Sequence, residues 1–101
     1  MTENYDAIVI GTGQAGPPLA VRLGKAGRKT AIIERKLVGG TCVNNGCIPT
    51  KTLIASARAA HMARRGGEFG VMIDSAIRVD MARVKARKDG IVAQSNRGVT
   101  E

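Results

Sequence analysis

Short apolar runs and one helical segment alternate over residues 1–34. Residues 5–10 are mostly apolar and rich in β-branched side chains, and residues 30–34 repeat this pattern. Both runs predict short buried strands. Residues 14–26 between them have apolar positions at helical spacing, and a glycine follows, as is common after a helix. A strand, a glycine turn, a helix and a strand in this order predict a βαβ unit with parallel strands.

The remainder of the chain has helical rather than strand periodicity. Pro49 suits a first helical turn, and residues 50–65 predict a helix that ends at two glycines. Residues 68–79 predict a loop with a short extended piece. Asp80 is placed to cap a last helix, whose apolar spacing continues to Val99. We therefore expect an α/β fold: a Rossmann-like βαβ portion with parallel strands, followed by helices, in a truncated domain.

The composition limits the size of the core. The chain has 101 residues, enough for one small domain, and contains one Phe, one Tyr and no Trp. Aliphatic side chains and many alanines must therefore supply the core, which we expect to be thin. Such a chain is expected to depend on a cofactor or on more protein to complete its packing.

The net charge of +8 raises the possibility of nucleic-acid binding. The basic residues are spread over both halves of the chain, and no aromatic residues lie among them to stack on bases. We therefore expect a solvated basic surface and no nucleic-acid partner. The first apolar run, residues 7–10, is too short for a signal peptide or a membrane span, so we expect a cytoplasmic protein without a membrane association.

The turn after the first strand fits the pattern G-x-G-x-x-G. Gly11 permits a sharp turn, Gly13 lets a pyrophosphate approach the backbone, and Gly16 allows close packing of helix and strand. Glu34, at the end of the second strand, is placed to accept hydrogen bonds from an adenosine ribose, and its charge would repel a 2′-phosphate. The site is therefore expected to bind FAD or NAD rather than NADP. The alternative is a glycine-rich turn without a ligand.

Two prolines follow this turn closely. Pro17 and Pro18 fall near the fourth and fifth positions of a helix that begins at residue 14, where Pro18 is at the limit of what a helix tolerates. We therefore expect the helix to begin late or to be slightly kinked.

The two cysteines, Cys42 and Cys47, form a C-x4-C pair. In a reducing cytoplasm such a pair is expected to bind a metal or to be catalytic. A zinc site with four Cys and His ligands is excluded because the chain contains one His. The pair precedes a helix, whose N-terminus stabilises a thiolate, and Lys51 adds positive charge one helical turn later. These features favour an exchangeable dithiol over two unrelated buried thiols.

Residues 39–51 closely resemble the active-site signature of the class I pyridine nucleotide–disulfide oxidoreductases. This family includes dihydrolipoamide dehydrogenase, glutathione reductase and mercuric reductase. The glycine turn and Glu34 stand at the family's distance upstream, so the resemblance covers at least residues 5–55. Residues 13–18 differ from dihydrolipoamide dehydrogenase and are similar to bacterial members described as mercuric-reductase-like.

The resemblance implies an enzyme in which NAD(P)H reduces FAD and the flavin reduces the Cys42–Cys47 disulfide. Cys47 would be the inner thiol beside the flavin. Cys42 would be the outer, more accessible thiol that attacks a small-molecule disulfide or binds a metal-ion acceptor. The implied cofactor-binding residues are Gly11, Gly13, Gln14, Ala15, Gly16, Glu34, Arg35, Gly40, Thr41 and Lys51.

Members of the family are several times longer than this chain. They continue into an NAD(P)H domain and a dimerisation domain, and neither is expected within residues 1–101. We therefore expect these residues to form a partial FAD-binding domain of a homodimeric reductase. The alternative is a fragment that binds FAD or an adenine nucleotide and has no turnover of its own. The sequence leaves the electron acceptor open.

Overall fold

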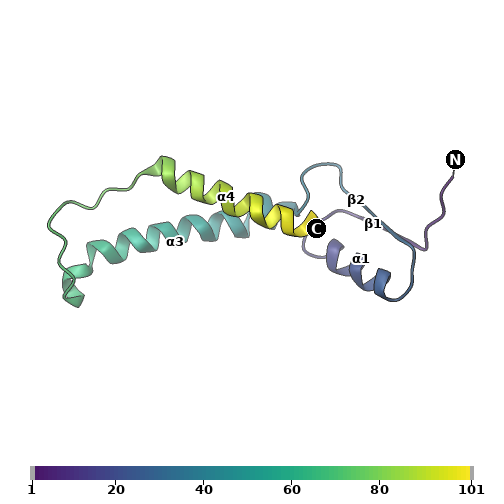
Figure 1. Ribbon diagram of the computed structural model, residues 1–101, viewed down its shortest axis with the longest axis horizontal. Coiled ribbons are helices and arrows are strands. Elements are labelled where there is room, and N and C mark those ends of the chain that lie inside the picture. Colours follow the sequence, from purple (N-terminus) through teal and green to yellow (C-terminus); the bar gives the residue numbers. More distant parts are fainter. Residues whose placement is uncertain (1, 101) are drawn as a thin grey trace.

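The computed structural model describes residues 2–100, which form an elongated molecule measuring 69 × 24 × 17 Å. A small sheet and one helix lie at one end, and two long helices extend away from them (Figure 1). The elements in chain order are β1 (Ala7–Ile10), α1 (Gly16–Lys25), β2 (Thr30–Ile33), α2 (Gly40–Asn44), α3 (Cys47–Arg64), η1 (Gly66–Phe69) and α4 (Met81–Thr100).

The first three elements form the predicted βαβ unit. Strands β1 and β2 are parallel, with Ala7 opposite Thr30 and Ile10 opposite Ile33. The backbone N–H of Gly11 extends this ladder by donating a 2.7 Å hydrogen bond to the carbonyl of Ile33. The predicted α/β class with parallel strands is confirmed. Both strands are shorter than the apolar runs predicted, because the pairing covers only four residues of each.

Helix α1 begins at Gly16, two residues later than the periodicity predicts. Pro17 and Pro18 therefore occupy positions where a helical N–H has no intrahelical partner, so the missing donors cost nothing. Leu19, directly after them, donates to the carbonyl of Ala15. The late start expected from the prolines is confirmed.

The two long helices lie side by side in opposite directions (Figure 1). Helix α3 begins at Cys47 rather than at residue 50, and the short helix α2 before it was not predicted. Residues 70–80 connect the helices through an irregular loop, as expected. Helix α4 continues through Gly98, which therefore does not cap it.

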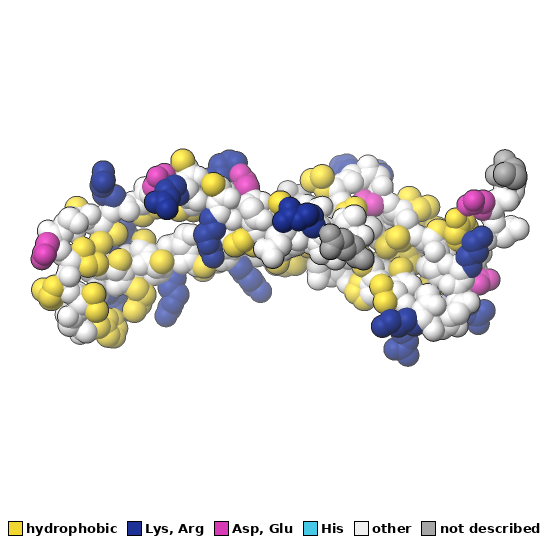
Figure 2. Space-filling model, in the orientation of Figure 1, with side chains coloured by type: hydrophobic (Ala, Val, Ile, Leu, Met, Phe, Trp, Pro, Cys, Tyr) yellow, Lys and Arg dark blue, Asp and Glu magenta, His cyan; other side chains and the backbone are white. Residues whose placement is uncertain are grey.

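The core is thin, as the composition predicts. Among the described residues, Val9 and Val43 are the buried hydrophobic side chains. Apolar side chains gather around the sheet and at the opposite tip of the molecule (Figure 2), and Ile10 is 84% exposed. The sheet therefore leaves apolar surface exposed on this chain. None of the helices within residues 2–100 is both long and apolar enough to span a membrane.

Candidate functional site

The glycine turn has the backbone that its sequence predicts. Gly11 has a φ of 104°, which favours glycine, and it turns the chain sharply at the end of β1. A Cβ on Gly16 would overlap the carbonyl of Gly11, so this glycine allows α1 to pack against the strand. A Cβ on Gly13 would meet no atom within 4 Å. The surface at Gly13 is thus open to a ligand.

The same turn presents unpaired backbone donors. Within residues 2–100, the N–H groups of Gly13, Gln14, Ala15 and Gly16 make no hydrogen bond to other protein atoms. They lie at the N-terminus of α1, where the helix dipole favours a negative charge. The two prolines that follow have no N–H, so an anion at this helix must take its hydrogen bonds from these four residues.

A hydroxyl connects the ends of both strands. Thr12, which is 6% exposed, donates a 2.8 Å hydrogen bond from Oγ1 to Oε1 of Glu34. The backbone N–H of Gly39 donates to the same hydroxyl over 3.1 Å. The second oxygen of Glu34 accepts a 3.0 Å bond from the N–H of Arg35. Glu34 is therefore held in one orientation by two donors.

The glycine turn touches the segment that carries the first cysteine. A Cβ on Gly40 would lie 2.6 Å from the Cα of Gly13, so only glycine permits this approach. The φ of Gly40 is 70°, in the same left-handed region. Two parts of the sequence that were predicted separately, the turn and the cysteine loop, are thus in direct contact.

Two hollows are lined in part by the residues of this contact. One, of about 310 Å³, is lined in part by Glu34, Arg35, Gly40 and Thr41. The other, of about 810 Å³, is lined by residues from both ends of the chain, including Gly13 and Gln14. Gly13 lines one hollow and Gly40 lines the other. The two hollows bring together most of the residues predicted to bind a cofactor.

Cys42 and Cys47 form a disulfide, with their Cα atoms 4.7 Å apart. Cys42 lies in α2, and Cys47 is the first residue of α3. Gly46 fits tightly between the two helices, since a Cβ there would lie 3.0 Å from the carbonyl oxygen of Thr41. The pairing of the two cysteines, favoured by their local sequence context and implied by the family resemblance, is present in the structure.

The exposure of the two cysteines is the reverse of what the sequence predicts. Cys47 is exposed, whereas Cys42 is half-buried. Cys42 lies in a helix, α2, that packs against both α3 and α4. Cys47 is the first residue of α3. The expectation that Cys42 is the more accessible thiol is therefore wrong for this structure.

The start of α3 can stabilise a thiolate. The first hydrogen bond into this helix runs from the N–H of Thr50 to the carbonyl of Gly46, over 3.0 Å. The N–H groups of Cys47 and Ile48 are left without an intrahelical partner, and Pro49 has none. Lys51 lies one turn further on and is exposed; it lines neither hollow.

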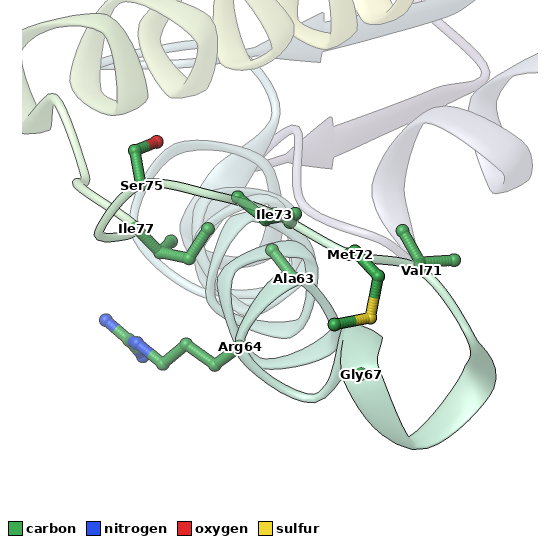
Figure 3. Close-up of a pocket in the computed structure, with 8 residues that line it drawn as sticks. All are labelled: Ala63, Arg64, Gly67, Val71, Met72, Ile73, Ser75 and Ile77. Carbon is green, nitrogen blue, oxygen red and sulfur yellow. The ribbon is translucent and has the colours of Figure 1, made fainter.

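A third hollow, of about 300 Å³, lies far from the cysteines, at the junction of α3, η1 and the connecting loop. Its charged side chain, Arg64, extends away from Met72 (Figure 3). The other lining residues are mainly small or apolar. This hollow holds neither the nucleophiles nor the anion donors of the site described above.

The residues that meet around Gly13 fit a dinucleotide. The open surface and free N–H groups suit a pyrophosphate, and Glu34 offers acceptors to a ribose. Each Glu34 oxygen retains a free lone pair beside the hydrogen bond that it already accepts. A family model described as pyridine nucleotide-disulphide oxidoreductase matches residues 5–100. The chain belongs to this family.

Similar proteins agree with this assignment. Dihydrolipoyl dehydrogenase 3 of Pseudomonas aeruginosa is 44% identical over 101 residues, covering 98% of this chain and 21% of that protein. Dihydrolipoyl dehydrogenase of Acholeplasma laidlawii is 37% identical over 99 residues, covering 98% of this chain and 30% of its own length. The resemblance predicted from residues 39–51 is confirmed.

Solved structures extend the comparison to the backbone. The Cu(II) complex of the HOCl-induced flavoprotein disulfide reductase RclA from Escherichia coli matches with a TM-score of 0.71 and 37% identity. A cysteine-to-serine mutant of the same protein matches with a TM-score of 0.75 and 35% identity. Each comparison covers 98% of this chain and 19% of the other. The chain thus spans 19–30% of the length of the relatives described here.

Sequence reasoning missed two residues of the site, Thr12 and Asn96. Thr12 lies two residues after β1 and Glu34 lies one residue after β2. Because the carboxyl ends of paired parallel strands lie at the same edge of a sheet, the pairing of β1 with β2 could have placed the two residues near each other. Asn96 contacts Asn44 across 52 positions of sequence. No local pattern indicates such a contact, which depends on how α4 returns along α3.

Proposed function

We propose that this chain is the FAD-binding and redox-active part of an NAD(P)H-dependent disulfide or metal-ion reductase. The single observation that carries the proposal is the contact between Gly13 and Gly40. It brings a turn suited to a pyrophosphate next to the helix that holds a disulfide. A dinucleotide seated on this turn would therefore lie near a pair of sulfurs able to accept electrons.

The chain's own residues would divide the binding of FAD between them. The N–H groups of Gly13–Gly16 would hold the pyrophosphate, and Glu34 would hold the adenosine ribose. Arg35, Gly40 and Thr41 line the same hollow as Glu34. Lys51 would add positive charge near the flavin. Bound FAD would supply the two-electron chemistry that links a nicotinamide to a disulfide.

The cysteine pair would carry the electrons onward. Two electrons and two protons convert the Cys42–Cys47 disulfide into two thiols. The thiolate of Cys42 would attack a substrate disulfide, forming a mixed disulfide and releasing one substrate sulfur as a thiol. The thiolate of Cys47 would then attack the sulfur of Cys42, releasing the second substrate sulfur and restoring the original disulfide. The start of α3 would stabilise the thiolate of Cys47.

The acceptor is proposed from the chemistry of the relatives. Several are named dihydrolipoyl dehydrogenases, which favours a small dithiol–disulfide pair as the substrate. The structural relatives are Cu(II) complexes of a disulfide reductase, which favours a metal ion as a second possibility. A mercuric-reductase-like activity belongs to this second class. The whole protein is proposed to be cytoplasmic and homodimeric, as the family resemblance implies.

Visible spectroscopy tests the assignment. Protein saturated with FAD should show a flavin spectrum. It should not retain FMN, because the glycine turn and Glu34 are proposed to bind the adenosine half of FAD, which FMN lacks. With the flavin oxidised, Cys42→Ser should show a long-wavelength thiolate-to-flavin band, and Cys47→Ser should lack it. Both should lose disulfide reduction while retaining FAD. A band that survives only in Cys47→Ser would reverse the roles of the two thiols, and normal turnover in both variants would contradict the enzyme proposal.

A second candidate function is binding of FAD without turnover. The thin core and the chain's span of 19–30% of its relatives favour it for these residues alone. NADH and NADPH oxidation by the FAD-loaded chain separates the two candidates. Oxidation coupled to lipoamide or Cu(II) reduction supports the reductase, whereas flavin binding without oxidation supports the binding fragment.

A further inference from the structure

Two asparagines meet at one backbone carbonyl beside the disulfide. The Nδ2 of Asn44 donates to the carbonyl oxygens of Val38, over 3.0 Å, and Gly40, over 2.9 Å. The Nδ2 of Asn96 donates to the same Val38 oxygen and to Oδ1 of Asn44, over 3.1 Å. Both side chains are half-buried. We call Asn44, Asn96 and the Val38 carbonyl the asparagine clamp.

The clamp holds a segment that has little stability of its own. Helix α2 has five residues, too few for an independent helix. Gly39 and Gly40 precede it with φ angles of 109° and 70°, and Gly46 follows. Glycines at both ends allow such a helix to pivot. Two specific ties therefore join α2 to its neighbouring helices: the disulfide to α3 and the clamp to α4.

These two ties differ in one respect: reduction removes one of them. When Cys42 and Cys47 are joined, the disulfide fixes α2 whether or not Asn96 is present. When the pair is reduced, the clamp is the specific tie that remains. The clamp therefore restricts the movement of α2 more strongly in the dithiol than in the disulfide. In the dithiol it keeps the two thiols near each other.

We propose that Asn96 is a positioning residue for the Cys42–Cys47 pair, acting through Asn44 to keep the reduced thiols in place for reoxidation. The inference rests on the proposed function, in which the pair cycles between disulfide and dithiol. Without the clamp, α2 gains freedom only in the reduced state. The equilibrium then moves toward the dithiol, and the pair becomes easier to reduce.

The test measures the disulfide–dithiol equilibrium of the 101-residue chain. Protein is equilibrated in dithiothreitol redox buffers, quenched with an alkylating agent and analysed by mass spectrometry. Asn96→Ala removes the clamp's hydrogen bonds from α4 to Val38 and Asn44. Asn96→Asp keeps the size of the side chain but lacks both donors. We expect each to shift the equilibrium about 3–10-fold toward the dithiol, or about 15–30 mV more positive for this two-electron couple.

The matched control is Gln94→Ala, which removes an exposed amide from the same helix. Its equilibrium should equal that of the unaltered chain. Circular dichroism of every variant separates loss of fold from loss of positioning. If the redox equilibria of both Asn96 variants lie within twofold of that of the unaltered chain, the inference is overturned. Loss of helical content in both variants would also overturn it, because Asn96 would then be a general structural residue. A pair that resists reduction in the unaltered chain would instead contradict the proposed function.

Discussion

The hydroxyl of Thr12 donates to Oε1 of Glu34 over 2.8 Å and accepts the N–H of Gly39 over 3.1 Å. One buried side chain thus ties the carboxyl ends of both strands to the loop before α2. Because the carboxylate is oriented before any ligand arrives, less freedom is lost when a ribose binds to it. Thr12 therefore supports the site without needing to touch a ligand.

Thr12→Val should weaken this arrangement. The substitution keeps the shape of the side chain but removes the hydroxyl, leaving the N–H of Gly39 buried without its acceptor. A buried unpaired donor costs about 1–3 kcal/mol, so the free energy of unfolding should fall by this amount. Urea denaturation followed by circular dichroism measures it. FAD affinity should fall as well, because Glu34 loses one of its two orienting donors.

Thr30→Val is the matched control for that change. Its hydroxyl donates a solvent-exposed hydrogen bond to the carbonyl of Arg28, over 3.2 Å. Water can replace that bond, so stability should change by less than about 0.5 kcal/mol. Equal losses in both variants would show that the hydroxyl of Thr12 has no special structural role.

Glu34→Ala should weaken FAD binding by about 1–2 kcal/mol, or roughly 5–30-fold in the dissociation constant. The change removes the acceptors proposed for the ribose but leaves the donors of the glycine turn. Fluorescence quenching during an FAD titration gives the constant. Glu68→Ala removes an exposed carboxylate that pairs with Arg65, far from the turn, and should leave FAD affinity unchanged. An unchanged affinity for Glu34→Ala would remove this residue from the proposed site.

Two glycine substitutions should have opposite effects on stability. Gly40→Ala places a Cβ 2.6 Å from the Cα of Gly13 at a φ of 70°, so it should cost roughly 1–3 kcal/mol and weaken FAD binding. Gly90→Ala adds a Cβ in open space within α4 and should add about 0.5–1 kcal/mol, because alanine favours a helix. Chemical denaturation of both variants checks the pair. A neutral Gly40→Ala would contradict the close approach of turn and cysteine segment.

The βαβ unit and the glycine turn could be predicted because their signals are local. Short β-branched runs, the three glycines and the two prolines each determine the backbone within a few residues of themselves. Even the late start of α1 followed from Pro17 and Pro18. The pairing of Cys42 with Cys47 could also be predicted from local sequence, since only four residues separate them.

Other features depend on contacts between distant parts of the chain. Helix α2 lacks a helical sequence pattern, and it is held by the disulfide and by Asn96, which lies 58 positions from Val38. The exposures of the cysteines follow from that packing, so they were predicted in the wrong order. The loop over residues 70–80 could be predicted only as irregular, because its path depends on where α3 ends and α4 begins.

The reactivity of the two thiols gives the last prediction. In the reduced chain without FAD, Cys47 should be alkylated before Cys42, because it is exposed while Cys42 is half-buried. The N-terminus of α3 should also increase its thiolate fraction. Peptide mass spectrometry after brief exposure to substoichiometric iodoacetamide measures the order.

If Cys47 is the inner thiol proposed above, saturating FAD should slow its labelling and leave that of Cys42 less affected. FMN, which lacks the adenosine half, is the control ligand and should protect neither thiol at the same concentration. Faster labelling of Cys42 in the chain without FAD would contradict the exposures described here, and equal protection of both thiols by FAD would contradict the division of roles between them.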